Sequence, residues 1–113
     1  MQKGQFEFKH GVLYKIKYAR AYRNDRIPKV VIANFKEETK WNLEFRHAME
    51  LDGYVTCGII AFEWEDIISI DPVAESEQEM WKKNTVDFMS RIIKQYGYDI
   101  CMEDVRGVTR YER

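Results

Sequence analysis

The chain has 113 residues, of which 45% are hydrophobic and 33% are charged, and its formal net charge is −1. These values exclude a disordered chain and indicate one globular domain, residues 1–113, with a hydrophobic core. No apolar run reaches the roughly 18 residues of a membrane span. Residues 1–5 carry no secretory signal, so we expect a cytoplasmic protein without a membrane partner.

Residues 1–71 are predicted to be mainly β-structure. Alternation predicts a short strand over residues 6–9 and a longer one over 12–23, with Tyr14, Tyr18 and Tyr22 on one face and lysines on the other. Residues 24–28 contain Asn, Asp and Pro, which favour a turn. The valine-rich run over 29–35 then completes a β-hairpin.

The next segment is ambiguous, because residues 37–51 are rich in helix formers while 41–47 alternate as in a strand. We favour the strand. Further strands are predicted over 54–62 and 67–70, joined by a short acidic turn. Two hydrophobic strands connected in this way over 58–70 are typical of SH3-like and Sm-like barrels. The expected fold is therefore α+β, with a strongly bent antiparallel sheet, an SH3-like or Sm-like partial barrel, packed against one C-terminal helix.

That helix is predicted over residues 76–96. Ser76 and Glu79 fit a capping box, and Gly97 would end the helix. Its apolar positions recur at steps of three and four residues and form one stripe, namely Trp81, Thr85, Phe88, Met89, Ile92, Ile93 and Tyr96. Residues 98–113 are expected to form short strands or a tail, with strands at 98–102 and within 105–111.

Charge is distributed unevenly along the chain. Residues 1–47 contain eleven Lys and Arg against five Asp and Glu, whereas residues 48–113 contain seven against fourteen. If this segregation persists in the fold, the molecule has a basic pole and an acidic pole.

No motif predicts catalysis, so we expect a non-enzymatic protein without a cofactor or metal. His10, His47, Cys57 and Cys101 are too far apart in sequence to suggest a metal site. Asp25 followed by Glu38-Thr39-Lys40 loosely resembles the acid and Glu-x-Lys pattern of some metal-dependent nucleases, which makes such an enzyme the third hypothesis.

Nucleic-acid binding is the second hypothesis. Six cations lie on or beside the first hairpin, with tyrosines interleaved: Lys15, Lys17, Arg20, Arg23, Arg26 and Lys29. Cations would contact phosphates and rings would stack on unpaired bases. Because alternation sends most tyrosines and lysines to opposite faces, the competing interpretation places the tyrosines in the core and the lysines in solvent.

The first hypothesis is an adaptor or inhibitor that binds a basic protein partner, such as a nucleic-acid enzyme, as phage or mobile-element accessory proteins do. Its surface would consist of Trp64 surrounded by acids, namely Glu63, Glu65, Asp66, Glu75 and Glu79. The alternative is that Trp64 covers the sheet core. A homodimer, built through the open side of the sheet or a swapped strand at 98–102, also stays open.

Overall fold

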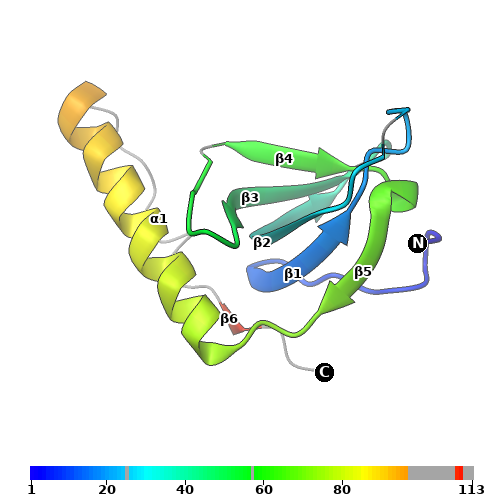
Figure 1. Ribbon diagram of the computed structural model, residues 1–113, viewed down its shortest axis with the longest axis horizontal. Helices are drawn as coiled ribbons and strands as arrows, with labels where there is room; N and C mark the ends of the chain where they lie inside the picture. Colours follow the sequence, from blue (N-terminus) through cyan, green and yellow to red (C-terminus); the bar gives the residue numbers. More distant parts are fainter. Residues whose placement is uncertain (25, 57, 97–108, 111–113) are drawn as a thin grey trace.

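The computed structural model describes residues 1–24, 26–56, 58–96 and 109–110, with the side chains of 92, 93, 95, 96, 109 and 110 excepted. It confirms the α+β class (Figure 1). The elements in chain order are β1 (Val12–Tyr18), β2 (Lys29–Glu38), β3 (Leu43–Glu50), β4 (Ile59–Phe62), the 3-10 helix η1 (Trp64–Asp66), β5 (Ile67–Asp71), α1 (Glu75–Tyr96) and β6 (Thr109–Arg110).

The sheet has the strand order β4-β3-β2-β1-β5, with every neighbouring pair antiparallel, and β6 pairs in parallel with the start of β1. In the described part of the chain no ladder joins β4 to β5. The sheet is therefore open, and the expectation of a barrel needs this correction. The ends of β1 and β4, which are not neighbours in this order, still approach each other, since the ring centroids of Tyr18 and Phe62 lie 4.6 Å apart.

Bulges account for the strong bend. The register between β2 and β3 shifts between Ile32 and Asn34, where β3 carries one extra residue, and His47 there adopts a φ of 55°. The register shifts again near Lys36, and β5 bulges beside Ile68. Each extra residue increases the local twist of its strand, so a short sheet can curl around a core.

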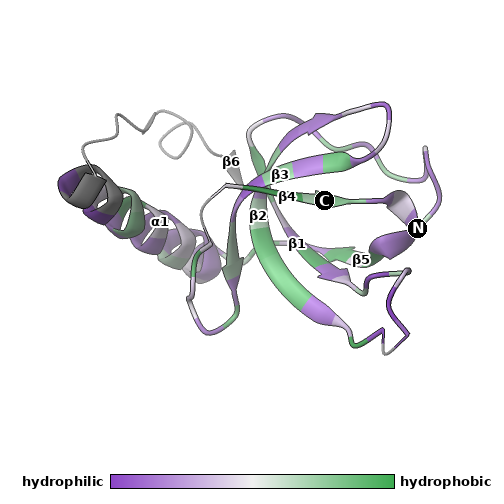
Figure 2. Cartoon of the chain, turned by 90° about the horizontal axis from the view of Figure 1, so that it is seen from above, coloured by the Kyte–Doolittle hydropathy of each residue, from purple (hydrophilic) through white to green (hydrophobic). Residues whose placement is uncertain are grey.

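Both faces of the sheet are covered, which explains why five consecutive residues of β2, 31–35, are buried. Alternate residues enter two different cores. Figure 2 shows hydrophobic residues along the strands and α1 on one side of the sheet. The aromatic core lies on one face, where Phe8 of the N-terminal segment packs 5.3 Å from Phe45. The helix-side core lies on the other face and includes Leu13, Ile32 and Trp81.

The predicted helix is confirmed, and the described part of its buried stripe follows the predicted spacing, with Phe88 half-buried; Ile92, Ile93 and Tyr96 lie outside the described side chains. Trp81, Thr85 and Met89 are four residues apart and almost fully buried. The Trp81 indole Nε1 donates a hydrogen bond of 2.7 Å to the carbonyl oxygen of His47. The helix is thus attached at the β3 bulge, and the bulge and the helix position depend on each other.

The predicted capping box at the helix start is wrong by two residues. Glu77 Oε1 accepts the backbone N–H of Ala74 at 3.1 Å, and the N–H of Gln78 bonds the carbonyl of Ala74 at 2.9 Å. The capping position is therefore Ala74, with Glu77 reaching back as the partner carboxylate. Ser76 and Glu79 are exposed.

Several predicted strand boundaries also change. The strand preferred over helix at 41–47 is confirmed as β3, whereas residues 6–9 pack over the aromatic core without joining the sheet. The first long strand ends at Tyr18, and pairing of the 54–62 segment as β4 begins only at Ile59. The predicted strand at 98–102 lies outside the described residues, as do Cys57 and Cys101.

Candidate functional site

The loop between β1 and β2 is fixed to η1 by one carboxylate. Asp66 is 2% exposed, and its Oδ1 accepts the N–H of Ala21 at 2.9 Å while its Oδ2 accepts the N–H of Glu63 at 2.9 Å. The N–H of Ala19 bonds the Asp66 carbonyl at 2.9 Å. A loop that would otherwise be free to move is therefore fixed at its first residues.

Arg20 strengthens this connection. Its Nη1 donates to the carbonyl of Ala61 at 2.6 Å and lies 3.4 Å from Asp66 Oδ2. Its guanidinium also covers the rings of Phe62 and Tyr18, at 4.8 Å and 5.2 Å from their centroids. Arg20 belongs to the predicted nucleic-acid site and Asp66 to the predicted protein-binding site. Their ion pair gives both residues a structural role.

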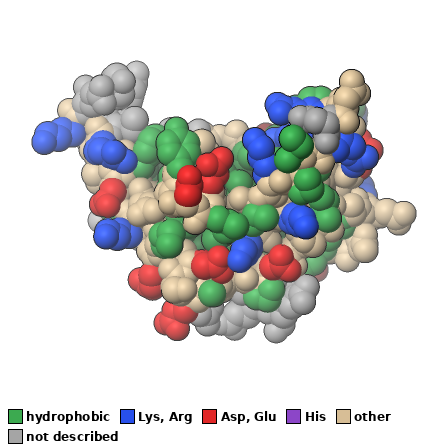
Figure 3. All heavy atoms as spheres, viewed as in Figure 1, with side chains coloured by type: hydrophobic (Ala, Val, Ile, Leu, Met, Phe, Trp, Pro, Cys, Tyr) green, Lys and Arg blue, Asp and Glu red, His purple; other side chains and the backbone are tan. Residues whose placement is uncertain are grey.

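Beyond this connection the loop encloses a hollow of about 290 Å³, which we call the basic hollow. The described residues that line it are Tyr18, Arg20, Arg23, Arg26, Ile27 and Lys29. Arg23, Arg26 and Lys29 are exposed, and none of them forms an ion pair with another described residue. In Figure 3, Lys and Arg side chains gather at the end of the molecule where Figure 1 places this loop.

Tyr18 forms part of the wall of the basic hollow. Burial raises the pKa of its phenol, the positive charges of Arg20 and Arg23 oppose that change, and Glu50 adds to it. The phenol is therefore a neutral hydrogen-bonding group at neutral pH. Glu50 is the acid whose charge reaches this wall, so the hollow is predominantly but not purely cationic.

The other predicted cations do not join this hollow. Lys15 pairs with Glu77 at 2.9 Å on the helix side of the sheet. Lys17 is exposed, but it stands two residues from Lys15 in β1 and therefore projects from the same helix-side face, opposite to Tyr18. Of the six predicted residues, the fold brings together three free cations and Arg20.

The predicted acidic surface is divided by the fold. The Trp64 ring is half-buried against the aromatic core, 5.7 Å from the ring of Phe8, which agrees with the alternative that it covers the core. Glu63 and Glu65 are exposed beside it. Glu75 and Glu79 lie at the start of α1, at the far end of β5 from η1 (Figure 1). The five acids therefore do not surround one exposed ring.

Glu63 and Glu65 influence each other. A hydrogen bond with the Glu65 side chain, followed by the negative charge of Glu65, raises the pKa of the exposed Glu63 carboxyl. This pair of like charges is a local feature of η1. On the face drawn in Figure 3, acidic and basic side chains lie side by side over the lower part and the helix, so the described residues of this face form no separate acidic pole.

A second hollow, of about 320 Å³, opens beside the first, and we call it the polar hollow. Its described lining residues are Arg20, Tyr22, Asn42, Ala61, Phe62, Glu63 and Asp66. Arg20 is common to both hollows. The polar hollow lies where the β1–β2 loop, the β2–β3 turn and η1 meet, which sequence spacing could not reveal.

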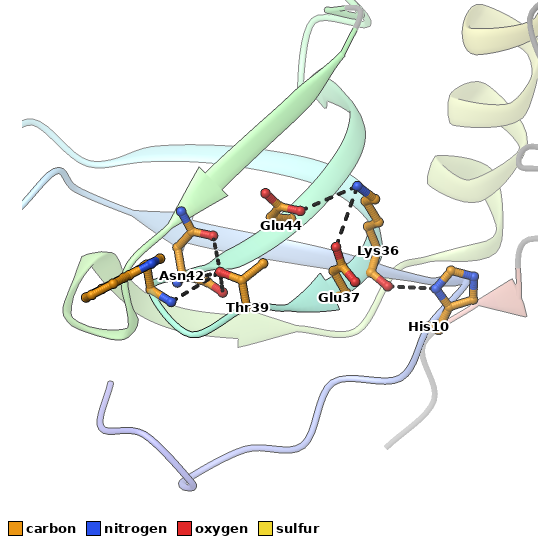
Figure 4. A network of polar contacts seen from close by, with 7 residues as sticks. His10, Lys36, Glu37, Thr39, Asn42 and Glu44 are labelled. Atoms are coloured by element: carbon orange, nitrogen blue, oxygen red, sulfur yellow. Dashed lines mark hydrogen bonds and ion pairs between the residues drawn. The ribbon is translucent and has the colours of Figure 1, made fainter.

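The β2–β3 turn is held by Thr39 (Figure 4). The Thr39 hydroxyl accepts the N–H groups of Trp41 and Asn42 at 3.2 Å and 3.1 Å, and it lies 3.0 Å from Asn42 Oδ1. This network holds Trp41 outward, with 76% of the residue exposed. The sequence reasoning singled out Trp64 and missed Trp41, although Thr39 and Asn42 are typical turn residues that flank it.

Neither the nuclease pattern nor a metal site gains support. Asp25 lies outside the described residues, and Glu38 makes a 4.0 Å ion pair with Lys3. Within the described ranges, no group of three or more His, Cys, Asp or Glu side chains is placed to hold a metal ion. The same ranges contain no helix long and apolar enough to cross a membrane.

Comparison with known proteins provides no further guide to the role of these two hollows. The chain matches no known protein family, no curated protein and no solved structure.

Proposed function

We propose that this chain is a small non-enzymatic binding domain whose basic hollow binds the phosphate backbone of single-stranded nucleic acid. The observation that carries the proposal is the gathering of Arg23, Arg26 and Lys29 around one hollow, without acids of the described chain paired to them. Cations grouped in this way repel one another, and a bound phosphate relieves that repulsion.

Exposed apolar groups beside these cations favour a single strand over a duplex. Tyr22 is 74% exposed and its ring lies 6.0 Å from the Arg23 guanidinium, while Ile27 is 64% exposed. A flat ring next to free cations matches the alternation of bases and phosphates in an unpaired strand. Such stacking contributes about 1–3 kcal/mol per base.

The number of free cations sets the expected salt dependence. Three phosphate contacts on a single strand give a slope of about −2 for log K against log salt, because each contact contributes about −0.7. We therefore expect the affinity for a twelve-residue oligothymidylate, measured by fluorescence anisotropy, to fall about 20-fold when salt rises fourfold.

Two matched substitutions test the location. Arg26→Gln removes one cation of the basic hollow and reduces the slope by about 0.7, whereas Lys17→Gln removes an exposed cation of the opposite face and leaves the slope unchanged. Binding that is absent, insensitive to salt, or equally affected by both substitutions would contradict the proposal.

A basic protein partner is the second candidate function. Exposed acids at both ends of β5 support it, together with Ile68, which is 48% exposed between them. The combined change Glu75→Lys and Glu79→Lys should abolish capture of such a partner at low salt, since both side chains are solvent-exposed. Capture that persists in this variant would refute this candidate for the helix-start acids.

A further inference from the structure

The polar hollow continues directly from the basic hollow. Arg20 lines both, and its guanidinium carbon lies 4.8 Å from the centroid of the Phe62 ring. A strand whose phosphates occupy the basic hollow would therefore bring a neighbouring base to the polar hollow. The polar hollow has a volume of about 320 Å³, which is within the range of roughly 300–1,000 Å³ found for small-molecule sites.

Asn42 lines the polar hollow and carries amide N–H donors. Its Oδ1 lies 3.0 Å from the Thr39 hydroxyl, which fixes the orientation of the amide (Figure 4). Its Nδ2 makes no hydrogen bond with any described residue. The N–H donors of this amide are thus oriented by the turn and available to a ligand.

Glu63 presents an acceptor from a different element. Its backbone is fixed because its N–H is bound by Asp66 Oδ2 at 2.9 Å, while its side chain is exposed at the hollow. No Lys or Arg of the described chain forms an ion pair with Glu63. A carboxylate without a cation repels phosphate but accepts readily from an amine.

Resting on the proposed function, we propose that the polar hollow receives one unpaired base bearing an exocyclic amino group. Glu63 accepts a hydrogen bond from the amine, and Asn42 donates to an acceptor on the base edge. Acidic side chains select cytosine through its N4 amine, whereas thymine presents the O4 acceptor at the same position and meets the carboxylate unfavourably. The Arg20 guanidinium and the Tyr22 ring supply planar surfaces for the base.

The test compares two pyrimidine homopolymers of equal length and charge, dodecamers of deoxycytidylate and thymidylate. We expect the intact chain to bind the cytidine strand about 10-fold more tightly, the effect of one charge-assisted hydrogen bond. Glu63→Gln should reduce this preference to about 1-fold, because an amide can both donate and accept. Glu79→Gln removes the same charge from an exposed acid at the start of α1, which does not line the hollow, and should retain the preference.

The outcomes separate this inference from the function on which it rests. Loss of the preference in Glu63→Gln and its retention in Glu79→Gln support the inference. Equal binding of both strands by the intact chain, or a preference that Glu63→Gln leaves unchanged, overturns the inference while salt-dependent binding itself stands. Failure of either strand to bind overturns the proposed function and the inference with it.

Discussion

Trp81 offers the sharpest test of how the helix is attached to the sheet. Its side chain is 0% exposed, and its indole N–H donates to the carbonyl of His47 over 2.7 Å. Trp81→Phe removes that donor and leaves a buried acceptor without it, at a cost of about 1–3 kcal/mol. The smaller ring also leaves a cavity, so we expect a total loss of about 2–4 kcal/mol in the free energy of unfolding.

The assay is urea denaturation followed by far-ultraviolet circular dichroism. Trp41→Phe is the matched control, because Trp41 is 76% exposed and its replacement should change stability by less than about 0.5 kcal/mol. If Trp81→Phe were as stable as the control, the indole hydrogen bond would not secure the helix, and the reasoning that joins the β3 bulge to α1 would fail.

Three further predictions concern other polar groups. Asp66→Ala should lower the free energy of unfolding by about 3 kcal/mol, since it removes a buried ion-pair partner, and an exposed-site change such as Glu65→Ala should not. Thr85→Val should raise the melting temperature by about 4 °C, because the buried hydroxyl has no hydrogen-bond partner in the described structure; a lower melting temperature would contradict this. Partial burial alone would raise the pKa of Glu77, but hydrogen bonds from Lys15 and the Ala74 backbone outweigh it and lower the pKa below 4.5. Ionised Glu77 therefore stabilises the fold above pH 4.5, and this contribution to the free energy of unfolding is lost as pH falls through the folded-state pKa. When the free energy of unfolding is measured by urea denaturation at several pH values, Glu77→Gln should show a smaller loss below pH 4.5.

The helix and strands could be predicted where the residue pattern that specifies them lies within a few consecutive residues. The helix over 75–96 follows from an apolar stripe at steps of three and four, β1 follows from alternation, and β2 follows from a valine-rich run after a Pro-containing turn. The β3 segment was harder to predict as a strand, because its helix propensity competes with its pairing to β2 and β4. Tertiary pairing determined the outcome, since intrinsic propensities differ by less than the free energy of burial.

The candidate site was predictable only as a set of residue types. Arg20 and Asp66 were assigned to different sites, because they are 46 positions apart in the sequence and no local pattern indicates that they form an ion pair. Trp64 was chosen for its acidic neighbours, yet its ring packs beside Phe8, and the exposed tryptophan is Trp41. A tryptophan is buried only where another segment packs over it, and the sequence does not show which segments pack together.

The sequence by itself determined the α+β class, the helix and its buried stripe, and the positive charge of the first hairpin, because spacing and composition encode these features over a few residues. Only the tertiary structure decided that Lys15 is neutralised by Glu77, that Lys17 projects from the opposite face, and that Arg23, Arg26 and Lys29 remain around one hollow. The physical reason is that the bend of the sheet brings the ends of β1 and β4 together, and bends arise from bulges whose positions depend on pairing between distant strands.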